Sequence, residues 1–534
     1  MKRNIKTIAT TLLASLTLVG CNDLDTKPGN YYVSSEQKED AISSNPELAK
    51  AGVVGISSTF NDFGGVYNAD DGSHFDFGWP AVLMFTECMG TDMVAPNTGY
   101  NHFASSGNYN LGNNNNAVNN MSWYYAYKII NSANSVVETV GTEPEDDELK
   151  LYSAQGLANR AYAYFILAQL FQDTYVGSAE KLAVPIITNE NSLEAAVNGC
   201  PRATVQEVYD QILSDLDQAI KNLENTTYSV SAIADTGSKR FISLGTAYGL
   251  RARVNLVMNK WQEAAADAAK AISTSKATPY SMTDVAKPAF NNPDDPSWMW
   301  CVYIDVNDRV VTSQIVNWAS HMGSLNFGYA SVGAWKMINK SLFDYINSTD
   351  VRKGWWLNGS GASANLNDSQ VTYLTQQQAT PYVQVKFAPY QNVIGTTTNA
   401  TSVILMRVEE MYLIQAEATA MAGNPTEGKR LLEEFVKTYR DPEYVCDGTS
   451  AANIQESVWM QRRIELWGEG LAYFDLLRLN KGLDRRGGGW DSSWVYNVPA
   501  PLKPLLVPNG EMDANPLIQA QNPTWSKPTA VADN

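Results

Sequence analysis

The sequence predicts a mainly α-helical protein: a scaffold of helical hairpins with long inserted loops and a few short β-strands. Apolar residues recur at helical spacing in several long segments, and two of these segments contain a short break of the kind that joins paired helices. Stretches rich in Asn, Gly and Ser, such as 108–120 and 358–378, separate the helical segments and have the composition of surface loops.

Chain length and charge limit the classes of function. The chain has 534 residues, of which 44% are hydrophobic, so a large core can form and a disordered chain is excluded. It carries 39 Lys and Arg residues against 56 Asp and Glu residues, which gives a net charge of −17. Phosphate backbones repel such a chain, and we therefore expect no nucleic-acid partner.

The amino terminus has the pattern of an export signal. A basic start at residues 2–6 leads into an apolar run over 7–20, which is too short to span a bilayer. The run ends in Leu18-Val19-Gly20-Cys21, which resembles a bacterial lipobox, where the cysteine thiol is diacylated and becomes the first mature residue. An ordinary signal peptide with a chance cysteine is the alternative. No later segment has eighteen uninterrupted apolar residues, so no transmembrane helix is expected.

These features divide the chain into three parts. We expect residues 1–20 to be a lipoprotein signal peptide, 21–45 an acylated tether, and 46–534 a single folded body. Several acyl chains on Cys21 would hold that body durably at a membrane surface.

The clearest helix covers residues 205–223, where eight apolar residues fall on one face. Thr204 and Glu207 form a capping box at its start. A second helix is expected over 152–171, and because it precedes the first one it is expected to be its antiparallel partner.

Two further segments have the pattern of helical hairpins. Residues 247–273 break at Asn259-Lys260, and residues 402–439 break at Gly423-Asn424-Pro425, where Gly ends one helix and Pro begins the next. Such pairs resemble tetratricopeptide units, which stack on their neighbours to bury a shared core. Between the two hairpins, residues 297–305 and 382–387 alternate as short strands do.

Three motifs in the second half of the chain carry a family resemblance. They are Met406 to Ala418 (MRVEEMYLIQAEA), Gln461 to Arg478 (QRRIELWGEGLAYFDLLR), and the tail of Val507 to Glu511 with Asn515-Pro516 and Gln521-Asn522-Pro523. Together with the lipobox and the helical hairpins, they resemble the signatures of SusD/RagB outer-membrane lipoproteins over nearly the whole mature chain. Ala472 departs from the pattern, since the family often has Arg there.

The resemblance implies a tetratricopeptide-like scaffold on the cell surface. It implies that the protein is a lid over a SusC-like TonB-dependent transporter in the outer membrane and captures oligosaccharides before their import. It also implies that the protein has no enzymatic activity, cofactor or metal. Some relatives bind peptides, so a RagB-like peptide-binding protein is the alternative, and a glycoside hydrolase on a helical scaffold is a more distant one. The net charge disfavours strongly anionic glycans unless a local potential opposes it.

The acidic residues of the second motif have a structural explanation. Glu465 and Glu469 lie one helical turn apart, whereas the two carboxyl groups of a glycosidase face each other across a cleft. Ion pairs with the nearby Arg462 and Arg463 are therefore expected. Similar pairs are expected between Asp475 and Arg478 and between Arg407 and Glu410.

The sequence contains no common nucleophile, phosphate-binding or zinc motif. Cys88, Cys200, Cys301 and Cys446 are widely spaced, and we expect buried free thiols, although an exported chain could also oxidise them. A histidine-based metal centre would require His74, His102 and His321, the only histidines, to meet. Calcium binding at Asp70, Asp71 and Asp76 is left open.

Two loops, 92–110 and 305–333, mix aromatic rings with amides outside any periodic pattern. A sugar ring stacks its apolar C–H face on an aromatic side chain, while its hydroxyl groups need polar partners at the edges. The resemblance also implies that loops in these positions supply the glycan-binding aromatic residues. We expect Tyr100 and Trp318 to stack on sugars, with polar contacts from the other members of the site, Asn101, His102, Asn317, His321 and Tyr329. Lesser candidates are Trp355, Trp356, Trp490 and Trp494.

Overall fold

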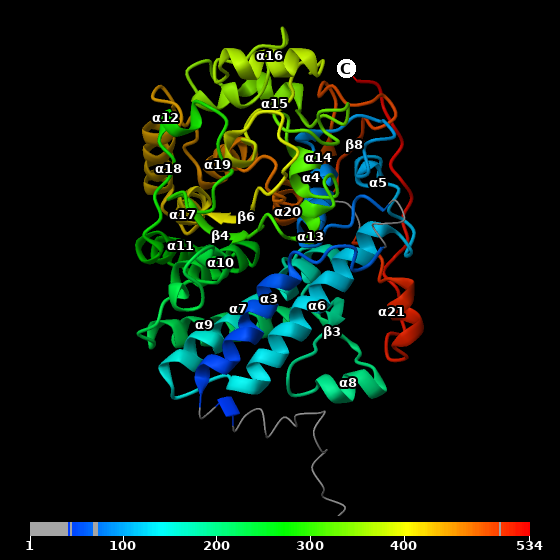
Figure 1. Cartoon of the computed structure of the whole chain (residues 1–534), viewed down its shortest axis with the longest axis vertical. Coiled ribbons are helices and arrows are strands. Elements are labelled where there is room, and N and C mark those ends of the chain that lie inside the picture. The colour runs from blue at the N-terminus through cyan, green and yellow to red at the C-terminus, as the bar shows by residue number, and fades with distance from the viewer. Residues whose placement is uncertain (1–40, 43–44, 68–72, 501–503, 534) are drawn as a thin grey trace, which may run out of the picture.

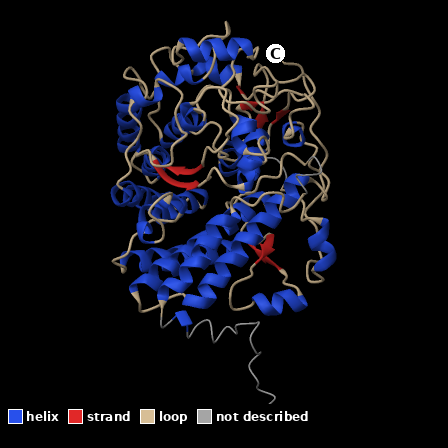
Figure 2. Cartoon of the chain, in the orientation of Figure 1, coloured by secondary structure: helices blue, strands red, loops and turns tan. Residues whose placement is uncertain are grey.

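The computed structural model of the chain describes residues 41–42, 45–67, 73–500 and 504–533. The expected signal peptide, Cys21 and most of the tether lie outside the described residues. About 49% of the chain is helical and the strands are few and short, which confirms the mainly α-helical class (Figure 2). Within the described ranges, no helix is both long enough and apolar enough to cross a membrane.

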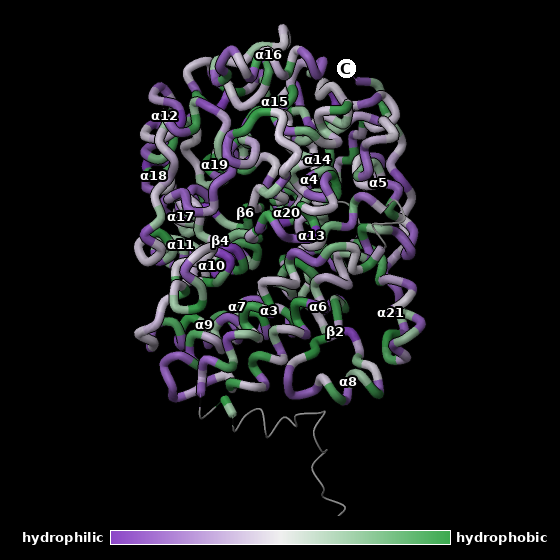
Figure 3. Tube along the Cα trace, viewed as in Figure 1, coloured by the Kyte–Doolittle hydropathy of each residue, from purple (hydrophilic) through white to green (hydrophobic). Residues whose placement is uncertain are grey.

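The first half of the chain forms a helical bundle in the lower part of the molecule (Figure 1). Its members are α3 (Lys50–Thr59), α6 (Ala117–Val140), α7 (Asp147–Phe171) and α9 (Val205–Glu224). The expected capping box of Thr204 and Glu207 begins α9. Helix α7 packs against both α6 and α9 and is buried along nearly its whole length, which confirms the expected pairing. Figure 3 shows apolar and polar residues mixed along these helices, as amphipathic elements around a shared core require.

Both predicted hairpins are present. The first is α10 (Leu244–Val257) with α11 (Trp261–Ser275), and Asn259 makes the turn with a left-handed φ of 59°. The second is α17 (Val408–Met421) with α18 (Pro425–Tyr439), and α11 packs on α17. Gly428 allows the close approach within the second hairpin, because a Cβ there would lie 2.6 Å from the Cβ of Ala420. The hairpins stack in sequence, and α19 (Ala451–Glu465) covers the next face of α17.

One expected strand is in place and one is not. Strand β4 (Trp298–Val302) lies within 297–305 and pairs antiparallel with β6 (Val403–Arg407). We expected 402–439 to be helical from its start, which is wrong because 403–407 is a strand. We also expected 382–387 to be a strand, and these residues form no continuous strand. Residues 382–387 form only isolated bridges, to Ala289, Met337 and Trp356, whereas the apolar run 403–407 is the strand that pairs with β4. An apolar run of this length does not distinguish a buried strand from a helical turn.

The remaining strands are two to four residues long and pair as β1 (Met93–Val94) with β5 (Met337–Ile338), β2 (Leu182–Pro185) with β3 (Arg202–Thr204), and β7 (Leu483–Asp484) with β8 (Asn497–Val498). The other helices are α4 (Trp79–Met89), α5 (Ala104–Gly107), α8 (Ser192–Asn198), α12 (Met282–Val285), α13 (Arg309–Thr312), α14 (Trp318–Met322), α15 (Lys340–Tyr345), α16 (Asp368–Gln376), α20 (Ala472–Arg478) and α21 (Asn509–Ala514). Helix α16 corrects the expectation of a loop over 358–378. Asn367 and Gln370 form a capping box at its start, and a prediction based on the composition of the segment did not consider this signal.

Buried ion pairs join the segments of the second half. Glu465 accepts hydrogen bonds from Arg352, Arg407 and Arg440, and Glu469 pairs with Lys386 at 2.7 Å. Burial by itself would raise the pKa of Glu465, but the arginines around it hold that pKa well below its usual value. Ion pairing of both glutamates is confirmed.

The partners of these groups differ from those expected. Arg462 pairs with Asp475 at 2.7 Å and Arg463 with Asp92 at 2.6 Å, so the arginines of the same helix turn away from Glu465 and Glu469. The expected pair of Asp475 with Arg478 is present at 2.7 Å. The expected pair of Arg407 with Glu410 is wrong, because Glu410 binds Arg253 from α10 and Arg407 binds Glu409, Glu465 and Glu469.

Candidate functional site

Elements from both halves of the chain bring the two predicted loops together. Residues 95–103 run from β1 to α5, and residues 317–329 contain α14 and the turn after it. Helix α4 packs against both α5 and α14, and the β1–β5 pair ties the start of the first loop to the segment that follows the second. In Figure 1, α4, α5 and α14 lie in the upper right part of the molecule.

Aromatic side chains from the two loops form one layered cluster. The His321 ring stacks between Phe77 and Tyr329, with centroid distances of 5.5 and 4.7 Å. His102 meets the Tyr329 ring edge-on at 4.7 Å, and Tyr100 lies 6.3 Å from Tyr329. Tyr100 is 54% exposed and His102 is half-buried, so these two side chains form the outer layer above the buried Tyr329 and His321.

Hydrogen bonds fix the inner layer. Nε2 of His321 must be the protonated nitrogen, because it donates to the carbonyl oxygen of His74 at 2.9 Å. The other nitrogen, Nδ1, is therefore an acceptor, and it is buried without a partner among the described residues. Nδ1 of His74 is hydrogen-bonded to the hydroxyl group of Tyr329.

The two predicted histidines are uncharged near neutral pH. Burial, together with the nearby His74 and Lys336, lowers the pKa of His102 to about 4. Burial, followed by the charge of Lys336, lowers the pKa of His321 well below its ordinary value. The half-buried His102 can therefore exchange hydrogen bonds with a ligand without offering it a positive charge, whereas His321 is fully buried.

All three histidines of the chain meet at this site, which was the condition for a histidine-based metal centre. Within the described part of the chain, however, no group of three His, Cys, Asp or Glu side chains is arranged to hold a metal ion. One ring nitrogen of His321 is hydrogen-bonded to a carbonyl group, and one ring nitrogen of His74 is hydrogen-bonded to Tyr329. His74 had been considered only as a metal ligand. Its place in this cluster carries no local sequence signal.

Three predicted site residues are buried and shape the loops. Trp318 is 7% exposed and packs edge-on against Phe387 at 5.0 Å, so the expectation of an accessible stacking ring is wrong. Asn317 caps α14 by accepting from Ser320 N at 2.8 Å, and Asn101 donates to Pro96 O at 2.9 Å within its own loop. The lesser candidates are buried as well, namely Trp355, Trp356, Trp490 and Trp494.

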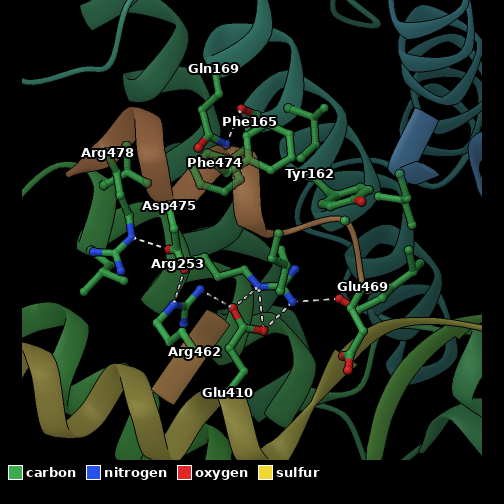
Figure 4. Close-up of a pocket in the computed structure, with 17 residues that line it drawn as sticks. Tyr162, Phe165, Gln169, Arg253, Glu410, Arg462, Glu469, Phe474, Asp475 and Arg478 are labelled. Atoms are coloured by element: carbon green, nitrogen blue, oxygen red, sulfur yellow. Dashed lines mark hydrogen bonds and ion pairs between the residues drawn. The ribbon is translucent and has the colours of Figure 1, made fainter. Parts of the chain in front are cut away.

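A separate cavity lies where α7 and α10 meet α20 (Figure 4). The labelled side chains in Figure 4 show Arg253 directed at Glu410, and Arg462 at Asp475. The cavity has about 40 Å³ of room for the centres of water molecules, which suits a few waters and excludes a sugar ring. It belongs to the buried ion-pair network.

The remaining chemical expectations concern acids and thiols. Asp76 accepts hydrogen bonds from the backbone of Val66 and Tyr67 and from the hydroxyl group of Tyr125, whereas Asp70 and Asp71 lie outside the described residues.

All four cysteines of the described chain are free. Three are buried as expected, and Cys200 is partly exposed.

Two family models match the chain in succession. One is described as "Starch-binding associating with outer membrane" and matches residues 82–256, and the other is the SusD family and matches residues 349–525. The SusD-like protein P2 of Formosa agariphila is 22% identical over 95% of this chain and 98% of that protein. The SusD-like protein P38 of the same organism is also 22% identical, over 69% of this chain and 73% of that protein.

Solved structures share the fold. A SusD-like carbohydrate-binding protein from Bacteroides vulgatus is 22% identical with a TM-score of 0.69, covering 88% of this chain and 96% of that one. A laminarin-binding SusD-like protein is 19% identical with a TM-score of 0.60, covering 89% and 99%. At these identities, structural similarity supports the fold alone.

Proposed function

The chain belongs to the SusD/RagB family, and from this premise we propose that it is a cell-surface lipoprotein that binds oligosaccharides and delivers them to a SusC-like TonB-dependent transporter in the outer membrane. The structural neighbours whose names state a ligand bind carbohydrate or laminarin, and SusD-family proteins are not enzymes. The buried pairing of Glu465 and Glu469 agrees with this, because neither carboxylate can reach a glycosidic bond.

The observation that carries the proposal is the meeting of the two loops at one aromatic cluster. Tyr100 presents an exposed ring on which the C–H face of a sugar can stack. Beside it, the uncharged His102 can hydrogen-bond to hydroxyl groups, and the buried, unpartnered Nδ1 of His321 needs a donor that a water molecule can supply. Asn101, Asn317 and Trp318 support the loops from within.

Isothermal titration against a panel of oligosaccharides and a peptide mixture, with analysis of the products, tests the proposal. We expect at least one glycan to bind without being cleaved. Tyr100→Ala should weaken that binding, whereas Tyr228→Ala should not, because Tyr228 is a similarly exposed tyrosine that follows α9 in the bundle. Binding of peptides alone would favour the RagB-like alternative, and release of shorter sugars would favour a hydrolase.

The transporter and the membrane anchor rest on family membership and the lipobox. Affinity purification of the full chain from its own outer membrane should recover a TonB-dependent transporter. Recovery of the chain alone, with its glycan binding intact, would contradict delivery while leaving the binding function in place.

A further inference from the structure

A buried cation without a counterion lies beside the aromatic cluster. Lys336 is 1% exposed, and its Nζ donates one hydrogen bond, to the carbonyl oxygen of Ala334 at 2.8 Å. No carboxylate of the described chain forms an ion pair with it. A buried ammonium group in this state is costly, and most buried charges in proteins are paired.

Short hydrogen-bonded links connect Lys336 to the residues of the cluster. The amide of Ala334 donates to Tyr329 O at 3.0 Å, two residues before Lys336. The carbonyl oxygen of Lys336 accepts from Gln384 N at 2.9 Å, and the side chain of Gln384 donates to Met322 O at 2.6 Å, next to His321. The charge of Lys336 is close enough to lower the pKa of both His102 and His321.

The neighbouring described acids have other partners. Glu87 accepts from the backbone amides of Gly468 and Gly470 at 2.9 Å each, and Asp92 is paired with Arg463. Asp76, two residues after His74, is held by backbone amides and by Tyr125. The cluster therefore combines the uncharged imidazoles of His102 and His321 with the unpaired positive charge of Lys336, in a chain whose net charge is −17.

We propose that the sugars bound at this site are acidic ones, carrying a carboxylate or a sulfate ester, and that Lys336 selects them. This rests on the proposed glycan-binding function and specifies its substrate class. The net charge of the chain opposes anionic ligands at long range, but the interior screens a buried charge much less than water does, so Lys336 determines the local potential. The acid group of the sugar would supply, at longer range, the negative charge that the described residues do not pair with Lys336.

Matched acidic and neutral probes test the proposal by isothermal titration. The probes are short oligogalacturonates with their carboxyl-reduced forms, sulfated carrageenan oligosaccharides with their desulfated forms, and neutral laminarin oligosaccharides. We expect the full chain to bind a carboxylated or a sulfated member more tightly than its neutral counterpart, and the two pairs distinguish the two sources of charge.

A charge-removing variant assigns the effect to one residue. Lys336→Met should weaken binding of the acidic sugar by roughly tenfold, the scale for unit charges about 10 Å apart at an effective dielectric constant of about 20, and should leave a neutral sugar unaffected. Lys340→Met is the control, since Lys340 is exposed and pairs with Asp344 at the surface. Circular dichroism checks that both variants fold. If Lys336→Met does not fold, the acidic and neutral probe pairs, measured on the unaltered chain, test whether the site prefers acidic sugars.

The outcomes separate this inference from the proposed function. Binding of neutral sugars in preference to their acidic counterparts would overturn the acidic-sugar proposal and leave glycan binding standing. Equal loss of acidic and neutral binding in Lys336→Met, or no loss at all, would overturn the role of Lys336. If no sugar binds to the full chain, the proposed function itself fails.

Discussion

Replacing Trp318 and Tyr100 separately by alanine should give opposite effects. Trp318 is buried against Phe387 in the core, whereas more than half of Tyr100 is exposed at the proposed ligand surface. Trp318→Ala should therefore lower stability, and Tyr100→Ala should lower affinity. Both residues lie in loops of similar composition, and the sequence had suggested the same stacking role for both.

The expected losses of stability and of affinity follow from how deeply each side chain is buried. Truncating a buried aromatic side chain to alanine costs about 3–5 kcal/mol in the free energy of unfolding. For a body of this size the entropy of unfolding is about 1 kcal/mol per kelvin, so the midpoint of thermal unfolding should fall by about 3–5 °C for Trp318→Ala. Loss of a well-packed aromatic contact costs about 1–3 kcal/mol of binding free energy, so Tyr100→Ala should weaken glycan binding by roughly 5- to 150-fold.

Differential scanning calorimetry and isothermal titration on the same preparations make the comparison. Trp318→Phe should recover part of the lost stability, because a smaller ring can still contact Phe387. The reasoning is refuted if Trp318→Ala keeps its unfolding midpoint and loses affinity, or if Tyr100→Ala lowers the midpoint and keeps affinity.

Four further outcomes are expected. Glu465→Gln should destabilise the chain by about 3–5 kcal/mol in urea unfolding, since it breaks buried pairs with three arginines, while the same assay should show no measurable loss for the exposed Arg430→Met. The folded pKa of His102, about 4, is depressed from 6.5, so the folded state binds fewer protons than the unfolded state between these values, and stability should fall as pH drops through this window. Unfolding followed against pH should show a shallower fall for His102→Gln, and an unchanged slope would contradict the shift. Cys21→Ala should leave folding intact and move the protein out of the membrane fraction in a strain without the transporter; a variant that stays in the membrane would argue against the lipobox. Glycan affinity measured before and after treatment with EDTA should be the same. If EDTA lowered the affinity and added calcium recovered it, the acidic run around Asp76 would be a metal-site candidate again.

The sequence was sufficient to predict the helical scaffold, because the signals that begin and end a helix involve residues close together in the sequence. The capping box at Thr204 and the Gly-Asn-Pro break at 423–425 are short-range signals, and the elements they predict are present. Strand β6 was missed because its pairing with β4 joins residues about a hundred positions apart. An apolar run of five residues carries no information about such a partner.

The candidate site could be predicted only in part. Composition identified the two loops, and the cluster of Tyr100, His102 and Tyr329 forms between them. Composition could not show which members face inward, because burial in a loop depends on tertiary packing. Asn317 illustrates this, since an asparagine before a short helix is as typical of an N-cap as of a sugar contact.

The second family motif and the proposed ligand site are physically connected, although they share no residue. Arg463, from the second family motif, holds Asp92 at 2.6 Å, and the indole of Trp467 donates to the carbonyl oxygen of Asp92 at 2.9 Å. Asp92 lies immediately before β1, from which the Tyr100 loop departs. From the other side, Arg485 donates to carbonyl oxygens at Gly90 and Gly107, at either end of the same region. A loop fixed at both ends loses little further conformational freedom when a ligand binds, which favours affinity without adding contacts. The motif therefore holds the base of the proposed site, and the motif residues that carry the family resemblance lie outside the cluster that we propose contacts the sugar.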